Sequence, residues 1–294
     1  MQAACARFLV CPVCRRPLRP AGAALRCAGG HGFDVAREGY VNLLLTRHRR
    51  ARMVGDTQAM VAARAGFLAR GHYAPLADAV AELVAGHLRS QGAAGPGARA
   101  DAGCVLDVGC GTGYQLGRLR ERLLADGGPL PCLFGTDVSK HAVRRAARDH
   151  PQVGFLVADT RTGIPLADHS AVALLDVFAP RDGAEFARLL APGGLLLVVT
   201  PGPAHLAELA ATVGLVGIQP EKQRAVADGL APWFRQTAVR RLRSTMELNG
   251  TEAAELARMG PSAWHLAPVA LAAVERLDRL AVTADFHLGA YTTG

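Results

Sequence analysis

The sequence has little lysine, few aromatic residues and no long apolar run. Only two of its 33 basic residues are lysines, Lys140 and Lys222, and aromatic residues occupy 5% of the 294 positions. Arg, Asp, Gly or Pro interrupts every apolar run before it reaches the ~20 residues that a membrane-spanning helix needs. Residues 1–10 lack a sustained apolar core and a small-residue cleavage site, which excludes a secretory signal peptide. We therefore expect a cytoplasmic protein with no membrane partner.

The overall composition is that of a folded globular protein. Half of the residues are hydrophobic and a fifth are charged, which excludes intrinsic disorder. The 33 basic residues outnumber the 25 acidic ones and give a formal net charge of +8. Because guanidinium groups suit phosphate oxygens and guanine edges, a nucleic acid is one partner that fits this charge. An Arg-rich composition that reflects only biased coding is the alternative.

The seven cysteines form a poor disulfide framework, because their number is odd and their spacing is uneven. We expect the N-terminal cysteines to bind metal, and we expect plain burial for Cys104, Cys110 and Cys132.

Three thiols and an imidazole are concentrated in the segment CPVCRRPLRPAGAALRCAGGHGFD, residues 11–34. Two residues separate Cys11 from Cys14, twelve more precede Cys27, and three more precede His31. This Cys3His spacing predicts a structural zinc ion, which would supply the stability that a module of about forty residues lacks in its core. With four protein ligands the ion keeps no open coordination position, so we expect it to fold a module and not to catalyse.

A redox-active CxxC pair is the alternative interpretation of Cys11 and Cys14. Such a pair needs a helix that begins behind the first thiol. Pro17 and Pro20 follow closely and argue against a helix at this place.

The C-terminal two thirds of the chain alternate short apolar runs with helical patterns. Helix-like stretches at 139–150 and 183–191 lie among five apolar runs that predict buried strands, at 105–109, 131–137, 153–159, 171–178 and 194–200. This alternation predicts an α/β, Rossmann-like fold with a mostly parallel, doubly wound sheet. Two segments with a period of two, 238–248 and 281–292, predict an antiparallel pair at one edge.

A basic and helical connector precedes these strands. It begins with TRHRRARMVGD at residue 46 and continues with the helical pattern DTQAMVAARAGFLARG. We expect Asp56 as the N-cap of that helix and Gly71 as its C′ residue. A second helix is expected over residues 75–88, before a surface loop that ends at residue 103.

The segment VLDVGCGTGYQLGRL, residues 105–119, combines a strand, a glycine turn and the start of a helix. Glycines at 109, 111 and 113 let the backbone pass directly under a ligand. The dinucleotide fingerprint GxGxxG does not fit, because Tyr114 stands at its last glycine. The motif present is DxGxGxG, and it begins at Asp107.

This motif resembles the first motif of the class I S-adenosylmethionine-dependent methyltransferases. The resemblance implies that Asp107 and the glycine backbone (Gly109, Gly111, Gly113) contact the methionine part of the cofactor. It also implies that Asp137 binds the ribose hydroxyls through its two acceptor oxygens, and that Asp159 lies beside the adenine. Three aspartates that merely cap loops at strand ends are the alternative.

The segment Asp176–Pro180 stands where base-modifying N-methyltransferases carry a polar–Pro–Pro–aromatic signature. The match is loose, since the proline and the aromatic residue are transposed. Phe178 could stack on a target base or belong to the core, and the sequence leaves both open.

The zinc cluster, the glycine loop and the segment GFDVAREGYVNLLL between them resemble one narrower family, the bacterial 23S rRNA guanine-N1 methyltransferases. These enzymes modify a hairpin loop in domain II, and some give actinomycete producers resistance to tylosin-type macrolides. The resemblance covers nearly the whole chain, including GHYAPL around Tyr73, TPGPAHL around His205 and GPSAWH around Trp264. The segment DTQAMVAARA and the Ala/Arg-rich composition favour the macrolide-resistance branch.

The narrower resemblance implies three parts: a zinc-binding RNA-recognition module (1–45), a basic connector that contributes to the cofactor site (46–103) and a methyltransferase domain (104–294). It implies one zinc ion on Cys11, Cys14, Cys27 and His31, and S-adenosylmethionine bound by Tyr73, Gly111, Thr112 and His205. It also implies a homodimer. Without the resemblance, Tyr73 and His205 would be ordinary residues at helix starts.

The implied substrate is 23S rRNA, with N1 of a guanine as the methyl acceptor. Because N1 carries a proton and faces a pairing partner in a helix, the target must lie in a loop or be extruded. Asp176 is the candidate acceptor of that proton by position alone, although solvent could take it instead. RNA contacts are expected from Phe178 and from Arg15, Arg16, Arg47, Arg49, Arg50 and Arg52. A solvated basic linker is the alternative for residues 47–52.

Two other function classes compete with RNA methylation. A methyltransferase that acts on a small molecule, such as an antibiotic intermediate, would keep the glycine loop but would have no use for the Cys3His module. A zinc-dependent RNA-binding protein with a relic cofactor fold is disfavoured by the intact DxGxGxG motif and by Asp137.

Overall fold

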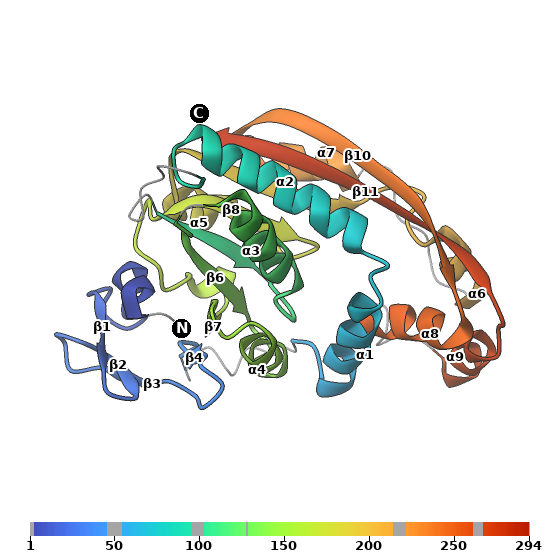
Figure 1. The fold of residues 1–294 in the computed structure, drawn as a ribbon, viewed down its shortest axis with the longest axis horizontal. Coiled ribbons are helices and arrows are strands. Elements are labelled where there is room, and N and C mark those ends of the chain that lie inside the picture. Colours follow the sequence, from blue (N-terminus) through green and yellow to red (C-terminus); the bar gives the residue numbers. More distant parts are fainter. Residues whose placement is uncertain are drawn as a thin grey trace.

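The computed structural model describes residues 3–45, 55–95, 103–127, 129–213, 222–260 and 267–293. Its centre is an eight-stranded sheet (Figure 1). The strands are β4 (Val41–Asn42), β5 (Cys104–Val108), β6 (Cys132–Asp137), β7 (Gly154–Val157), β8 (Ala171–Val177), β9 (Leu190–Pro201), β10 (Phe234–Leu248) and β11 (Leu280–Thr293), and their order in the sheet is β10-β11-β9-β8-β5-β6-β7-β4.

Six of these strands run parallel, from β4 at one edge to β9. The antiparallel strands β11 and β10 complete the other edge. The mostly parallel, Rossmann-like sheet and its antiparallel pair are therefore confirmed. All five residues of β5 are buried, because helices cover both faces of a parallel sheet, and this explains its nearly unbroken apolar sequence.

Two layers cover the sheet. On one face α2 (Ala74–Ser90), α3 (Tyr114–Asp126) and α4 (Lys140–Asp149) pack in one hydrophobic cluster with alternate residues of the strands. On the other face α5 (Gly183–Leu189), α7 (Lys222–Leu230) and the N-terminal module pack on the remaining residues. Among the described helices, none combines the length and the apolar character that crossing a bilayer requires.

Four further helices gather at one end of the molecule, beyond the carboxyl ends of the parallel strands. They are α1 (Gln58–Ala69), α6 (Ala207–Val213), α8 (Gly250–Met259) and α9 (Pro268–Glu275). Figure 1 shows α1 against α8, and α8 beside α9. This group of helices closes the end of the sheet at which ligands bind in open α/β folds.

The N-terminal module is a three-stranded antiparallel sheet of β1 (Leu18–Ala21), β2 (Ala24–Cys27) and β3 (Gly32–Asp34), preceded by the 3-10 helix η1 (Ala3–Phe8). Its buried Leu9, Leu18 and Leu25 belong to the same apolar cluster as Phe134 and Leu156 of the large sheet. After the module, β4 joins the edge of the large sheet. The module and the large sheet thus share one core.

A disulfide joins Cys5 in η1 to Cys132 at the start of β6, with 5.6 Å between the two Cα atoms. The expectation of metal binding for Cys5 and of plain burial for Cys132 is therefore wrong. Local spacing could not reveal this pair, because 127 residues separate its members in the sequence. Cys104 and Cys110 are free and buried, as expected.

The start of α1 differs by one residue from the expectation. Thr57, not Asp56, is the N-cap, and its hydroxyl oxygen accepts a hydrogen bond of 3.3 Å from the amide of Met60. Asp56 instead pairs with Arg64 at 2.8 Å. Both residue types cap helices well, so the sequence alone could not choose between adjacent candidates. Gly71 has a φ of +81° just after the C-cap and is the expected C′ residue.

Removing an apolar contact between the module and the sheet should destabilise the whole chain. Leu9 is fully buried and forms an antiparallel bridge with Leu166. We expect Leu9→Ala to lower the free energy of unfolding by about 2–5 kcal/mol, as other large-to-small core substitutions do. Urea unfolding of zinc-loaded protein, followed by circular dichroism, measures this change.

Val13→Ala is the matched control, because Val13 lies in the same module but is 47% exposed. We expect a change within about 0.5 kcal/mol for this variant. Equal effects of the two substitutions would contradict a shared core.

Candidate functional site

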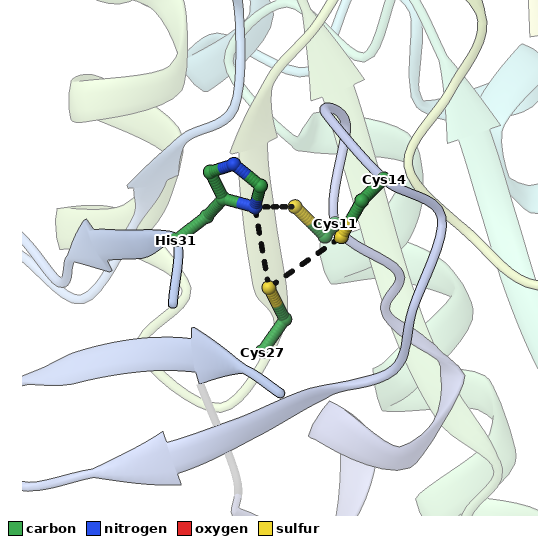
Figure 2. Close-up of side chains that lie close together, drawn as sticks. All are labelled: Cys11, Cys14, Cys27 and His31. Atoms are coloured by element: carbon green, nitrogen blue, oxygen red, sulfur yellow. Dashed lines mark hydrogen bonds between the residues drawn. The ribbon is translucent and has the colours of Figure 1, made fainter. Parts of the chain in front are cut away.

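Four potential metal ligands converge in the N-terminal module (Figure 2). Nδ1 of His31 lies 3.6 Å from Sγ of Cys11 and 3.5 Å from Sγ of Cys27. Sγ of Cys14 lies 3.6 Å from Sγ of Cys27, and all four ligand atoms lie within 4.8 Å of one another. The residues between 11 and 31 thus bring the predicted ligand set together.

These separations fit a tetrahedral zinc ion. Zinc–sulfur bonds of about 2.3 Å place the corners of a tetrahedron about 3.8 Å apart. A Cβ at Gly29 would lie 3.2 Å from Sγ of Cys14, so glycine keeps the backbone close to the thiols. The residues after Cys14 enter β1 and not a helix, which disfavours the redox-pair alternative.

The surroundings of Cys27 favour the thiolate form of its side chain. Burial opposes its ionisation, but hydrogen bonds from the His31 ring and from the amides of His31 and Gly29 lower its pKa to about 6. A thiolate is the form that coordinates zinc.

A second group of functional side chains lies at the carboxyl end of the large sheet. The turn after β5 passes through Gly109, Gly111 and Gly113, whose φ angles of +70°, +54° and +77° are left-handed. Glycine adopts this conformation without strain. A Cβ at Gly109 would approach the Cβ of Ala179 to 2.5 Å, so the glycine turn packs directly on the segment that follows β8.

Four aspartates surround this turn, each within two residues of the end of a neighbouring parallel strand. They are Asp107 (β5), Asp137 (β6), Asp159 (after β7) and Asp176 (β8). The carboxylate of Asp137 accepts hydrogen bonds from the amides of Gly111 at 3.0 Å and Ser139 at 2.8 Å. This pair of bonds ties the end of β6 to the glycine turn.

Several carboxylate oxygens at this edge are buried and have no hydrogen-bond partner in the described structure: both oxygens of Asp107 and one each of Asp159 and Asp176. Burial and the neighbouring charges of Asp176 and Asp137 raise the pKa of Asp107 well above its usual range. Burial likewise raises the pKa of Asp176 to about 7, although Arg181 lies 3.1 Å away and opposes the shift. Unpaired buried acceptors are costly, and they indicate a ligand that brings donors or positive charge.

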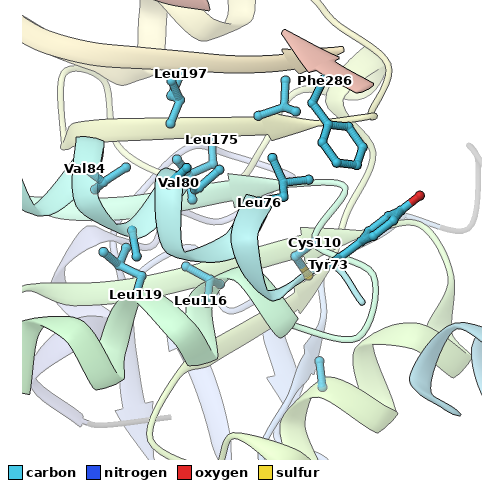
Figure 3. Close-up of a cluster of buried hydrophobic side chains, with 14 of the residues drawn as sticks. Tyr73, Leu76, Val80, Val84, Cys110, Leu116, Leu119, Leu175, Leu197 and Phe286 are labelled. Carbon is cyan, nitrogen blue, oxygen red and sulfur yellow. The ribbon is translucent and has the colours of Figure 1, made fainter. Parts of the chain in front are cut away.

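Aromatic rings form one wall beside these carboxylates. The rings of Tyr73 and Phe286 meet edge to face at 5.2 Å, and Tyr73 Oη lies 3.4 Å from Nε2 of His205. Figure 3 shows Tyr73 at the end of the apolar cluster of α2 and α3, with its hydroxyl directed away from the leucines. Burial lowers the pKa of His205 to about 4, so its ring is neutral at physiological pH. Nδ1 of His205 accepts from the amide of Asp285 at 3.3 Å, which orients the ring.

Phe178 lies at the outer side of this wall. Its ring is stacked on His205 with 6.2 Å between centroids, and the residue is 44% exposed. Its φ of +59° is unusual for an aromatic residue. A half-exposed aromatic ring on a strained backbone favours a binding role over a core role.

The expected RNA-binding arginines fall into two groups. Arg15 donates to the carbonyl of Leu166 and pairs with Asp168 at 3.0 Å, so part of its guanidinium holds the module against the loop before β8. Arg16 is exposed. Arg47, Arg49, Arg50 and Arg52 lie outside the described residues, as does the segment around Trp264.

Three arginines at this edge escaped the sequence analysis: Arg64 over the glycine turn, Arg181 on Asp176, and Arg241, which forms two hydrogen bonds of 2.8 Å with Asp285. No local motif marks them. Arg181 follows β8 by four residues, whereas only the fold brings Arg64 and Arg241 to this edge.

Comparison with known proteins identifies the two parts of the chain that carry these side chains. Residues 9–52 match the zinc-ribbon family model described as "RlmA, N-terminal", and residues 105–194 match a methyltransferase domain. The chain is 47% identical to the 23S rRNA (guanine(748)-N(1))-methyltransferase of Streptomyces fradiae over 90% of this chain and 89% of that protein. It is 46% identical to a putative 23S rRNA (guanine-N(1)-)-methyltransferase of Micromonospora griseorubida over 96% of both.

A glycine turn ringed by strand-end carboxylates, on a Rossmann-like sheet with a zinc ribbon, defines an S-adenosylmethionine-dependent methyltransferase. The identity to the two relatives over about nine tenths of the chain or more identifies a narrower family within this class. The chain belongs to the family of the 23S rRNA (guanine-N1)-methyltransferases.

We expect one zinc ion per chain, and its loss when Cys27 is replaced. Cys27→Ala removes a ligand and exposes the remaining thiols, so the module should lose both metal and stability. Elemental analysis of the purified protein counts the ion. Cys104→Ala, which removes a free thiol outside the cluster, should retain one zinc per chain. Wild-type protein that holds no zinc would contradict this assignment.

The raised pKa of Asp176 predicts a pH-dependent stability. A buried carboxyl with a pKa of about 7 stabilises the fold while it is protonated, and this contribution is lost as the pH rises through 7. We therefore expect the stability of Asp176→Asn relative to wild type to increase by about 2 kcal/mol between pH 5.5 and 8.0. Urea unfolding across this range measures the difference, and a pH-independent difference would refute the shift.

Proposed function

We propose that the protein transfers a methyl group from S-adenosylmethionine to N1 of a guanine in a domain II hairpin loop of 23S rRNA. The proposal rests above all on the 47% identity, over 90% of the chain, with the Streptomyces fradiae enzyme whose name specifies guanine 748. We extend that target nucleotide to this chain. Resistance to tylosin-type macrolides is the physiological role that we propose for the modification.

In this proposal the three parts of the chain have separate tasks. Residues 1–45 bind zinc and present RNA, residues 46–103 connect the module to the cofactor site, and residues 104–294 carry out methyl transfer. The shared apolar core supports a fixed position of the module relative to the sheet. Arg15, Arg16 and the arginines between 47 and 52 would contact phosphates along the way to the site.

The cofactor would lie across the glycine turn. Asp107 and the backbone from Gly109 through Thr112 to Gly113 would hold its methionine part. Each oxygen of Asp137 accepts one backbone amide and retains a lone pair for a ribose hydroxyl. Asp159, with one buried unpaired oxygen, would lie beside the adenine.

S-adenosylmethionine supplies, when bound, a methyl group that its sulfonium already activates. The protein therefore chiefly has to align the acceptor nitrogen and exclude water. The ring of Tyr73 would face the sulfonium in a cation–π contact worth about 0.5–2 kcal/mol. His205, held by Asp285, would cover the same region.

The guanine would enter between Phe178 and Asp176. Phe178 offers a half-exposed ring on which an extruded base can stack. Asp176 has one buried oxygen without a partner and a pKa of about 7, which suits acceptance of the N1 proton near neutral pH. Arg181 fixes the other oxygen.

We further propose a homodimer that works in the cytoplasm, where 23S rRNA is found. The dimer rests on the family resemblance alone. The Cys5–Cys132 bond is unusual for a cytoplasmic protein, because disulfides are rare in that compartment.

Labelled S-adenosylmethionine tests the substrate directly. We expect label in a domain II hairpin transcript and a primer-extension stop at guanine 748, because a methyl group on N1 blocks base pairing. The same incubation with a pool of macrolide intermediates distinguishes RNA methylation from the alternative function, methylation of a small molecule. Label in a small molecule and not in RNA would overturn the proposal.

Substitutions of Asp176 and Phe178, where the guanine would enter, should change kcat or the KM for RNA more than they change cofactor binding. We expect Asp176→Asn to lower kcat by about 10²–10⁴-fold, as loss of a general base does. We expect Phe178→Ala to raise KM for RNA, and Phe178→Trp to restore it. Leu124→Ala, an exposed apolar residue on α3, should change neither constant. Wild-type turnover of Asp176→Asn would leave proton acceptance to solvent.

A further inference from the structure

Arg64, a residue with no role in the reaction described so far, reaches from α1 over the glycine turn. Its Nη1 lies 3.0 Å from the point at which a Cβ of Gly111 would stand, and its Cδ lies 3.7 Å from that point. The positive charge of Arg64 opposes the effect of burial on the pKa values of Asp137, Tyr73 and Cys110. The guanidinium therefore lies among three separate elements of the proposed cofactor site.

The guanidinium is held from one side only. Its Nη2 pairs with Asp56 at 2.8 Å and donates to the carbonyl of Met259 at 2.6 Å. Within the described part of the chain, no hydrogen-bond acceptor is recorded for Nη1, which is the nitrogen nearest Gly111. The side chain of Arg64 is 26% exposed, so an incoming ligand can reach it.

The charges of S-adenosylmethionine restrict what such a guanidinium can bind. The cofactor carries two cationic groups, the sulfonium and the α-ammonium, and a single anionic group, the methionine carboxylate. An arginine beside the cations would repel them, whereas its planar fork matches a carboxylate. Asp107, buried with both oxygens unpaired, provides the complementary partner for the ammonium.

We infer that Arg64 binds the methionine carboxylate of S-adenosylmethionine and so distinguishes the amino-acid end of the cofactor. The inference rests on the proposed cofactor function and adds a residue from α1 to the cofactor site. Asp56 and the C-terminal end of α8 hold the guanidinium over Gly111.

The experiment compares two ligands that differ only in this carboxylate. Isothermal titration of zinc-loaded wild-type protein with S-adenosylmethionine and with its decarboxylated analogue should show about 10–100-fold tighter binding of the former, as expected for one charge-assisted hydrogen-bonded pair. In Arg64→Met the affinity for S-adenosylmethionine should fall by the same factor, while the affinity for the decarboxylated analogue stays unchanged or rises. Arg64→Lys, which keeps the charge without the fork, should retain part of the preference.

Arg70→Met is the matched control. Arg70 is the C-cap of α1 and pairs with Glu252 and Glu255 of α8, so it contributes to the same helix contact without facing the glycine turn. This variant should keep the full preference for the carboxylate.

Two results would overturn the inference while the proposed function stands: equal binding of the two ligands by wild-type protein, or an equal loss of both in Arg64→Met. The first comparison needs no variant, so it can overturn the inference even if Arg64→Met does not fold; Arg64→Lys then tests the assignment to this residue. Failure of the wild-type protein to bind either ligand would instead overturn the proposed cofactor function, and the inference with it.

Discussion

The burial of negative charge at the carboxyl ends of the parallel strands is the constraint on which the functional part of this structure depends. Four adjacent strands, β7, β6, β5 and β8, each have an aspartate within two residues of the carboxyl end. An aspartate in such a position has few routes to neutralisation: a backbone amide, an arginine, a proton or a ligand. Asp137 uses amides and Asp176 uses Arg181 for one oxygen, but Asp107 uses neither. For Asp107 this leaves a proton or a cationic ligand.

The glycine turn and the aromatic side chains beside it are arranged around these carboxyl groups. The glycine turn brings backbone close to the carboxylates, and the wall of Tyr73, His205 and Phe286 excludes water beside them. Low polarity strengthens each charge interaction inside such a site. The neutral His205 adds no positive charge that would compete with the ligand. Positive charge enters at the rim, from Arg64, Arg181 and Arg241.

The zinc ribbon contributes differently. Its Cys3His ligand set lies on the face of the sheet opposite α2 and α3. The leucines of the module complete an apolar layer that α5 and α7 cover only in part. Three contacts thus attach the module to the methyltransferase part of the chain: the bridge of Leu9 to Leu166, the Cys5–Cys132 bond and the hydrogen bond of Arg15 to the carbonyl of Leu166. In the proposed function, a module packed in this way would hold RNA at a constant distance from the methyl-transfer site.

The sequence predicted the parts of the fold that depend on local pattern. Nearly continuous apolar strands, the alternating β10 and β11, and the ligand spacing of Cys11 to His31 all appear in the structure as expected. The wrong predictions are of two kinds. One concerns a contact between residues far apart in the sequence, and the other a choice between two adjacent residues that cap helices equally well. The Cys5–Cys132 bond spans 127 residues, and Thr57 and Asp56 are both good caps. Arg64 escaped notice because a lone arginine in an amphipathic helix is ordinarily a solvated residue, and only the fold places it over Gly111.

The number of protons released on cofactor binding tests most directly whether the buried carboxyl groups at the strand ends bind a cationic ligand. Titration of zinc-loaded protein with S-adenosylmethionine near pH 7, in two buffers of different ionisation enthalpy, measures the number of protons exchanged. Because burial raises the pKa of Asp107 and a bound ammonium would lower it, we predict net proton release that is smaller in Asp107→Asn. Binding without proton release, or release that is the same in both proteins, would contradict this role of the buried carboxylate.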